Sequence, residues 1–267
     1  MLATARRIYT GTKKRHDQLW NTFVMRPLAS LVVAVAAKTP VTPNQLTLVN
    51  LAIFLVATAL FIALPDPRGA LIAVAALELS YLFDCADGML ARHKKLASKQ
   101  GHLFDFFTDE LKATLLAGAL ALRLFRTGGL SFDPFALTLT SWAPGDPRFL
   151  IAGIAAVTIV ASAISLTNFI RRPELSGRET TVEAFYETQN NDSPRSLIRR
   201  IAGLALMFLR FLNHYPSHIW IFAVAGRLDV FLFMYTALNL LYLAKGWLGL
   251  VIRFGRPGPP PGETEQK

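Results

Sequence analysis

The chain has a single cysteine among its 267 residues, and few of its residues are charged. One cysteine excludes an intramolecular disulfide framework and a zinc site built from several cysteines. Charged residues make up 17% of the sequence, whereas soluble domains usually carry about a quarter. Apolar residues make up 52%, so most of the chain must bury apolar surface and is not disordered. The composition therefore favours a folded protein of the membrane class.

Six apolar stretches run through the sequence, and each is long enough for a membrane helix, which needs about 20 residues. Polar residues around Pro216 interrupt the fifth stretch, and we interpret it as one kinked span. The expected fold is an all-α integral membrane protein with six transmembrane helices. The stretches cover residues 46–64, 69–91, 102–125, 149–170, 197–224 and 230–252.

The segment before the first span has only a short apolar run, at residues 28–37. This run is too short to cross a bilayer, and its length suits an N-terminal amphipathic helix that lies in the membrane interface. Tyr9 and Trp20 are natural anchors at the headgroup level. We expect three parts, which are a cytoplasmic or interfacial segment at 1–45, a six-helix transmembrane domain at 46–252 and a disordered Pro/Gly-rich tail at 253–267.

The net charge of +10 is compatible with either nucleic acid or an anionic membrane as the partner. With six spans, the loops and ends on one side hold 20 of the 28 Lys and Arg residues. The positive-inside rule places that side, with both termini, in the cytoplasm. A nucleic-acid surface would instead need these charges on one soluble face. We therefore expect membrane lipid as a partner and no nucleic acid.

Two neighbouring spans carry four aspartates, Asp84 and Asp87 in the second span and Asp105 and Asp109 in the third. Spacings of three and four residues put each pair on one face of its helix. The basic loop at 92–100 is short, so the two helices must be antiparallel neighbours. Acids inside a membrane are costly and are by default candidates for function. We expect the two pairs to face each other near the cytoplasmic ends of the helices.

Four carboxylates at close quarters repel each other, and divalent cations would relieve that repulsion. Without Cys or His in the cluster, hard ions such as Mg²⁺ or Mn²⁺ are favoured over zinc. Four Asp suit two metals about 3.5–4 Å apart, as in many phosphoryl-transfer sites. Gly88, Ala91 and Gly101 would let a diphosphate approach the helix backbones, and Arg92 offers a forked phosphate ligand.

The same acids have other readings. Buried aspartates can form the cation or proton pathway of a membrane transporter, or they can simply pair with a nearby Lys or Arg. The spacing by itself leaves metal-dependent phosphoryl chemistry and cation-coupled transport open. A transporter gives no reason for the spacing of Gly88, Ala91, Arg92 and Gly101.

Residues 84–109 read D-C-A-D-G-M-L-A-R, then eight residues, then G-H-L-F-D-F-F-T-D. This segment resembles, at every fixed position, the D-x2-D-G-x2-A-R-x8-G-x3-D-x3-D signature of the CDP-alcohol phosphotransferase family. The resemblance implies six transmembrane helices, usually in a homodimer. It also implies transfer of a phosphate-linked group from a CDP-alcohol donor to an acceptor hydroxyl, with release of CMP. We expect such an enzyme in a prokaryotic cell membrane, with its site facing the cytoplasm.

The resemblance also implies roles for the motif residues. The four aspartates would bind two divalent cations, Mg²⁺ or Mn²⁺, and Asp109 would also be the catalytic base that takes the acceptor's proton. The nucleotide-binding residues would be Asp87, Gly88, Ala91, Arg92 and Gly101. A degenerate member that only binds CDP-lipid would have lost an Asp or the Arg, and none is lost here.

The donor and the acceptor stay open at this point. Most members of the family use CDP-diacylglycerol, which makes phospholipid synthesis the expected role, and the alternative is a soluble CDP-polyol such as CDP-inositol with inositol phosphate. A phosphorylated acceptor would need basic residues near Asp109, and the candidates are Lys112, Arg171 and Arg172. The two arginines also suit membrane anchoring by snorkelling.

The run T-P-N-Q-L-T at 42–47 resembles a segment found before the first span in many members of the family. Thr42 is a good N-cap, and Gln45 completes a capping box. The run therefore predicts a helix start, and a further role near the site is left open.

Overall fold

The computed structural model describes residues 1–12, 17–133, 138–172, 175, 208–209 and 211–254. These residues are mostly helical, as the sequence predicts. Three long helices follow each other, α3 (Pro43–Ala63), α4 (Pro67–His93) and α5 (Lys99–Thr127). They begin and end within a few residues of the first three predicted spans.

A side chain caps the first turn of each of these three helices. Thr42 and Gln45 form the predicted capping box, so α3 begins at Pro43 as the capping motif predicts, three residues before the apolar stretch at 46–64. Asp66 accepts from the backbone N–H of Gly69 at 2.9 Å to cap α4. Ser98 accepts from the backbone N–H of Gly101 at 3.0 Å to cap α5. These caps satisfy orphan N–H groups and fix where each helix enters the bundle.

Buried Arg123 of α5 stabilises the opposite end of α3. Its guanidinium donates hydrogen bonds to backbone carbonyls at the end of α3 and in the following loop, where the helix leaves carbonyls unsatisfied. The accepting carbonyls are those of Phe61, Leu64, Pro65 and Asp66, at 3.2, 2.5, 2.9 and 2.7 Å.

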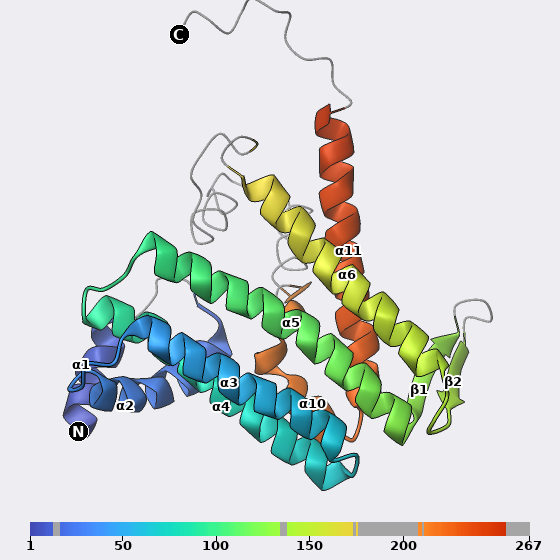
Figure 1. The fold of residues 1–267 in the computed structure, drawn as a ribbon, viewed down its shortest axis with the longest axis horizontal. Coiled ribbons are helices and arrows are strands. Elements are labelled where there is room, and N and C mark those ends of the chain that lie inside the picture. Colours follow the sequence, from blue (N-terminus) through green and yellow to red (C-terminus); the bar gives the residue numbers. More distant parts are fainter. Residues whose placement is uncertain (13–16, 134–137, 173–174, 176–207, 210, 255–267) are drawn as a thin grey trace, which may run out of the picture.

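The long helices pack in the order α4, α3, α5, α6 (Arg148–Arg171) and α11 (Leu228–Phe254). Figure 1 shows α3, α4 and α5 nearly aligned, with α6 and α11 side by side next to α5. Apolar side chains such as Phe54, Leu77, Leu120 and Phe231 form one core between these helices. This packing brings the end of α4 and the start of α5 to the same end of the bundle.

The N-terminal part, α1 (Leu2–Gly11), the π-helix η1 (Asn21–Met25) and α2 (Arg26–Ala36), lies against α4. Ile8 and Val33 form a second core with Met89 and Leu90 of α4. A short apolar helix therefore lies where the interfacial helix was expected, and it packs on the motif-bearing end of α4.

The segment between the third and fourth predicted spans contains a two-stranded antiparallel hairpin, β1 (Gly129–Asp133) and β2 (Thr138–Trp142). The all-α expectation is corrected by this addition. The carboxylate of Asp229 accepts from the backbone N–H of Leu130 at 2.6 Å, which ties the hairpin to the start of α11. That contact joins residues distant in sequence, so local sequence patterns did not reveal it.

Among the described residues, four helices are long and apolar enough to cross a membrane, namely α3, α4, α6 and α11. Helix α5 is as long, but its charged residues keep it out of that group. The predicted fifth span, 197–224, lies mostly outside the described residues. Its described end holds η3 (Tyr215–Ser217) and α10 (Ile219–Val224). The expected tail at 253–267 lies outside the described residues too, apart from its first two residues, which end α11.

Candidate functional site

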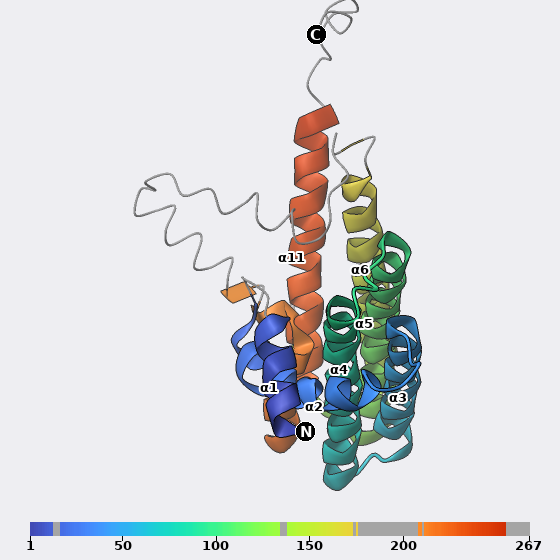
Figure 2. The ribbon, with the colours of Figure 1, turned by 90° about the vertical axis from the view of Figure 1, so that its left-hand side faces the viewer.

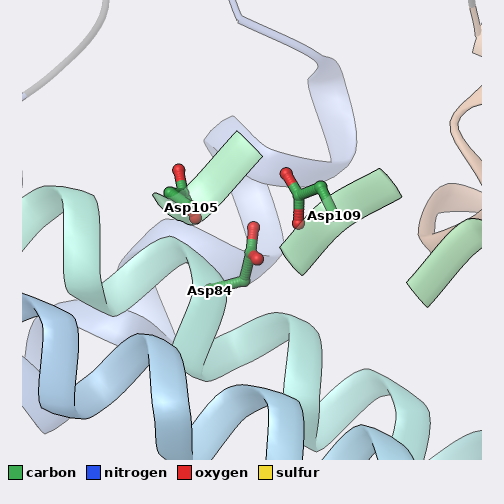
Figure 3. Close-up of side chains that lie close together, drawn as sticks. All are labelled: Asp84, Asp105 and Asp109. Carbon is green, nitrogen blue, oxygen red and sulfur yellow. The ribbon is translucent and has the colours of Figure 1, made fainter. Parts of the chain in front are cut away.

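Three of the four motif aspartates meet at one end of the bundle. Oxygen atoms of Asp84, Asp105 and Asp109 all lie within 4.8 Å of one another. Figure 3 shows Asp84 reaching from α4 towards the two carboxylates of α5. Asp84 and Asp109 both contact the ammonium of Lys112. The side chain of Asp109 is the more accessible of the two, at 49% exposed against 17% for Asp84. The predicted facing of the two pairs is thus seen for these three residues.

Asp87 lies one turn farther along α4 and is buried at 4% exposed. Its Oδ2 accepts a 2.7 Å hydrogen bond from the hydroxyl of Thr47 on α3. The structure therefore places Asp87 beside the cluster of three, with one carboxylate oxygen held by α3. Thr47 belongs to the T-P-N-Q-L-T run, so this run contacts the motif as well as starting the helix.

Asn50, one turn after Thr47 on α3, orients Asp84. Its amide nitrogen donates to Asp84 Oδ1 at 2.8 Å, and its amide oxygen accepts from the hydroxyl of Ser80 at 2.5 Å. Asn50 is fully buried, so these bonds satisfy an otherwise costly polar group. The sequence interpretation missed both Asn50 and Ser80. The sequence feature that could have revealed Asn50 is its spacing of three residues from Thr47, which puts both polar side chains on one face of an apolar helix.

Lys112, a predicted acceptor contact, points at the acids. Its ammonium lies 2.6 Å from Asp84 Oδ1 and 2.7 Å from Asp109 Oδ1, and the residue is 2% exposed. A buried ammonium needs such partners, because an unpaired buried charge is strongly disfavoured. The ammonium of Lys112 is therefore part of the carboxylate cluster.

The small residues of the motif leave room beside the cluster. A Cβ on Gly88 would lie 3.5 Å from Arg92 Nη1, so the exposed guanidinium of Arg92 extends over this glycine. A Cβ on Gly101 would lie 3.1 Å from both Asn44 Oδ1 and Ser98 Oγ, which is a close approach of α3 to the start of α5. Half-buried Ala91 lies next to Arg92 on α4.

Arg171 and Arg172 lie at the end of α6, which packs along α5. The guanidinium of Arg171 stacks on the ring of Phe106, with 5.2 Å between the guanidinium carbon and the ring centroid. Arg172 lines a groove of about 460 Å³ between α5 and α6, together with Glu110 and Asn168. Both arginines are thus beside the helix that carries Asp105 and Asp109.

A polar network from the C-terminal half joins α4 one turn before Asp84. The hydroxyl of Tyr81 donates to Asn21 Oδ1 at 2.6 Å and lies 2.7 Å from His214 Nε2. The other ring nitrogen of His214 lies 2.6 Å from the hydroxyl of Ser217. The sequence interpretation missed this network, because its members are distant in sequence and none belongs to the motif.

The donor chemistry of the cluster fits a divalent cation. All three groups are carboxylates, which are the ligands that Mg²⁺ and Mn²⁺ prefer. Three like charges this close also need a cation to offset their repulsion, and Lys112 supplies only one positive charge. Asp84, Asp105 and Asp109 could therefore hold a metal ion.

The comparison with protein families agrees with the geometry. Residues 40–225 match the family model described as CDP-alcohol phosphatidyltransferase. The match covers more than half of the chain, and it includes the T-P-N-Q-L-T run, the aspartate motif and the described residues up to α10. No curated protein matches this chain.

Proposed function

The chain belongs to the CDP-alcohol phosphatidyltransferase family, and from that premise we propose the following reaction. The enzyme, a membrane phosphotransferase for substituted phosphate groups, transfers the phosphate-linked alcohol of a CDP-alcohol to an acceptor hydroxyl and releases CMP. We propose CDP-diacylglycerol as the donor, which makes the product a phospholipid. The observation that carries this proposal is the cluster of Asp84, Asp105 and Asp109 beside Gly88 and Arg92.

In the proposed reaction, the acceptor oxygen forms a bond to the phosphorus that bears the alcohol. The bond from that phosphorus to the CMP oxygen breaks, and CMP leaves with the electron pair. Bound divalent cations, two Mg²⁺ ions in our proposal, would supply positive charge to the diphosphate and to the leaving CMP. Asp84, Asp105 and Asp109 would hold them, with Asp87 as a fourth ligand through Oδ1, because Thr47 occupies Oδ2.

We assign the base to Asp109, which takes the proton from the acceptor hydroxyl. Its side chain is 49% exposed, so an acceptor can reach it. Its Oδ1 faces Lys112, so Oδ2 is the oxygen that accepts the proton in this proposal. A base must come within about 2.6–3.2 Å of the hydroxyl that it deprotonates.

The nucleotide would lie over the end of α4. Gly88 has no side chain to block the diphosphate, and Arg92 extends over that position as a charged phosphate ligand. Asp87, Ala91 and Gly101 complete the proposed nucleotide site. Arg171 and Arg172 would bind the phosphate of a phosphorylated acceptor, since α6 carries them along α5.

We also propose that the protein is a homodimer in a prokaryotic cell membrane, with six transmembrane helices and an N-terminal interfacial helix. The site and both termini would face the cytoplasm. The distribution of Lys and Arg supports this orientation. Basic residues at that face would favour anionic lipid by about 1 kcal/mol for each well-placed side chain.

The test uses purified full-length protein in detergent with Mg²⁺. CDP-diacylglycerol and CDP-inositol are each combined with a panel of hydroxyl acceptors, including inositol phosphate, and CMP and products are identified by mass spectrometry. We expect CMP release with CDP-diacylglycerol and almost none from Asp109→Asn. Asp146→Asn is the matched control, because Asp146 pairs with Arg148 at 2.6 Å at the start of α6 and is not part of the cluster.

Several outcomes would overturn the proposal. Activity only with CDP-inositol would replace the lipid donor by a soluble one. Near-normal turnover by Asp109→Asn would remove the base assignment. Metal-coupled flux in liposomes, with no CMP from any donor, would identify a transporter instead.

A further inference from the structure

We propose that Lys112 is a resident cation of the metal site, which holds Asp84 and Asp109 together and limits how tightly the site binds divalent cations. The inference rests on the proposed function, because it takes the carboxylate cluster as a metal site. It assigns Lys112 a positioning role towards the acids rather than a contact with the acceptor.

The ammonium of Lys112 is held in place by two carboxylates of the motif. It contacts one oxygen from each helix, Asp84 Oδ1 of α4 at 2.6 Å and Asp109 Oδ1 of α5 at 2.7 Å. The side chain of Lys112 is 3% exposed, so solvent and salt screen these pairs less than they would screen a pair at the surface. Lys112 therefore joins the two halves of the motif directly.

Asn50 reinforces the same arrangement. Its amide donates to Asp84 Oδ1, the oxygen that also faces Lys112. Two buried donors thus converge on one oxygen of Asp84. A divalent cation that joins the cluster of Asp84, Asp105 and Asp109 would bind beside the ammonium, while Lys112 keeps its contacts to the two Oδ1 atoms.

The positive charge of Lys112 also affects how tightly the site binds metal ions. When all four motif aspartates are ionised, they carry four negative charges, and Lys112 lies within hydrogen-bond distance of two of them and offsets one charge. Removing that positive charge leaves a more negative site, which attracts a divalent cation more strongly. Lys112 therefore keeps the metals from binding too tightly for nucleotide turnover, and it keeps Asp109 oriented as the base.

The test measures Mn²⁺ binding to the purified full-length protein without any CDP-alcohol, from the electron paramagnetic resonance signal of free Mn²⁺. We expect Lys112→Met to bind Mn²⁺ at least tenfold more tightly than the wild type. Lys112→Arg, which keeps the charge, should stay near the wild type. Lys95→Met is the matched control, because Lys95 is an exposed lysine of the loop between α4 and α5, and it should change the affinity less than twofold.

A second readout separates this role from simple structural support. In CMP-release assays of Lys112→Met, the Mg²⁺ concentration for half-maximal rate and kcat should both fall. If Lys112→Met does not fold, Lys112→Gln replaces it in both measurements, since the amide removes the charge and keeps a donor.

Unchanged or weaker Mn²⁺ binding in a folded neutral variant would overturn the inference. A higher KM for a phosphorylated acceptor with unchanged Mn²⁺ affinity would also overturn it, and would make Lys112 an acceptor ligand. Because Mn²⁺ binding is measured without substrate, this result is independent of the proposed reaction. A protein that releases no CMP can still show or refute the charge effect.

Discussion

The hydroxyl of Thr47 on α3 donates a 2.7 Å hydrogen bond to Asp87 Oδ2 on α4, across forty positions of sequence. Both residues are buried, at 3% and 4% exposed. The bond joins the T-P-N-Q-L-T run at 42–47 to the aspartate motif, and it fixes the orientation of the one motif aspartate outside the cluster of three. Helix α3 is therefore part of the site, although it carries no acid.

Replacing Thr47 by Val keeps the shape of the side chain and removes the donor. We expect Thr47→Val to lower the free energy of unfolding by about 1–3 kcal/mol, because Asp87 Oδ2 loses a buried partner. CMP release should fall at least tenfold, while Thr47→Ser should retain most of it. Thermal unfolding in detergent and the CMP assay measure the two effects.

The control for this change is Thr58→Val on the same helix. Thr58 donates only within α3, to the carbonyl of Leu55 at 2.8 Å. It should leave CMP release near the wild-type level. Equal losses of activity in both valine variants would show that the Thr47–Asp87 bond has no special part in the site.

The variant Gly88→Ala tests whether the diphosphate of the CDP-alcohol lies over this part of α4. A Cβ there would lie at an ordinary 3.5 Å from Arg92 Nη1, and alanine favours a helix by about 1 kcal/mol over glycine. Gly88→Ala should therefore fold at least as well as the wild type. We expect its KM for the CDP-alcohol to rise about tenfold or more, because the methyl group occupies the path of the diphosphate.

Gly118→Ala on α5 is the matched control for Gly88→Ala, since a Cβ there would lie 3.7 Å from Val157 Cγ2. It adds the same methyl group away from the motif and should leave KM unchanged. A KM for Gly88→Ala equal to that of this control would place the diphosphate elsewhere.

Arg123 supports the bundle at the end opposite the motif. Arg123→Met removes the donors to four backbone carbonyls at the end of α3 and in the loop after it. A carbonyl that stays buried without a partner costs about 1–3 kcal/mol, and Phe61 is the buried residue of the four, so the thermal midpoint should fall by several degrees. Arg68→Met, a loss of an exposed arginine in the same region, should leave the midpoint unchanged.

Asp66 gives a pH dependence at the start of α4. The backbone N–H of Gly69 donates to its carboxylate and holds the pKa of Asp66 below its ordinary value of 3.8. Because the folded pKa is lower than the unfolded one, the ionised cap stabilises the fold above the unfolded pKa, and that stabilisation is lost as the pH falls through the folded value.

Asp66→Asn keeps an acceptor for the cap and removes the charge. We expect the wild type to have the higher thermal midpoint near neutral pH, and the difference should shrink as the pH approaches about 3. Thermal unfolding of both proteins across this range measures it. A constant difference over the whole range would contradict a contribution from the ionised cap.

Much of the site follows from the spacing of residues 84–109. Intervals of three and four residues put acids on one face of each helix, and a short loop brings the end of α4 and the start of α5 to the same end of the bundle. The two helices were expected to pack directly on each other, but α4 packs mainly on α3, and α5 packs mainly on α3 and α6. Local rules of this kind predicted the meeting of Asp84, Asp105 and Asp109, and the capping chemistry of Thr42 predicted the start of α3. Helix lengths followed from the apolar stretches, within a few residues at either end.

The partners of the acids did not follow from spacing. Lys112 was expected at an acceptor phosphate and lies between two carboxylates, because the orientation of α5 against α4 determines what its side chain meets. Asn50 and Thr47 needed the register between α3 and α4, and the hairpin needed the approach of Asp229 to Leu130.

By itself, the sequence determined the apolar helices, the motif and the side of the bundle on which the acids gather, since these depend on periodicity and on residues close along the chain. Only the tertiary structure decided which oxygens of Asp84, Asp87 and Asp109 have donors, and which residues supply them. Hydrogen bonds require atoms within about 3 Å, and helix packing alone sets that distance between α3, α4 and α5.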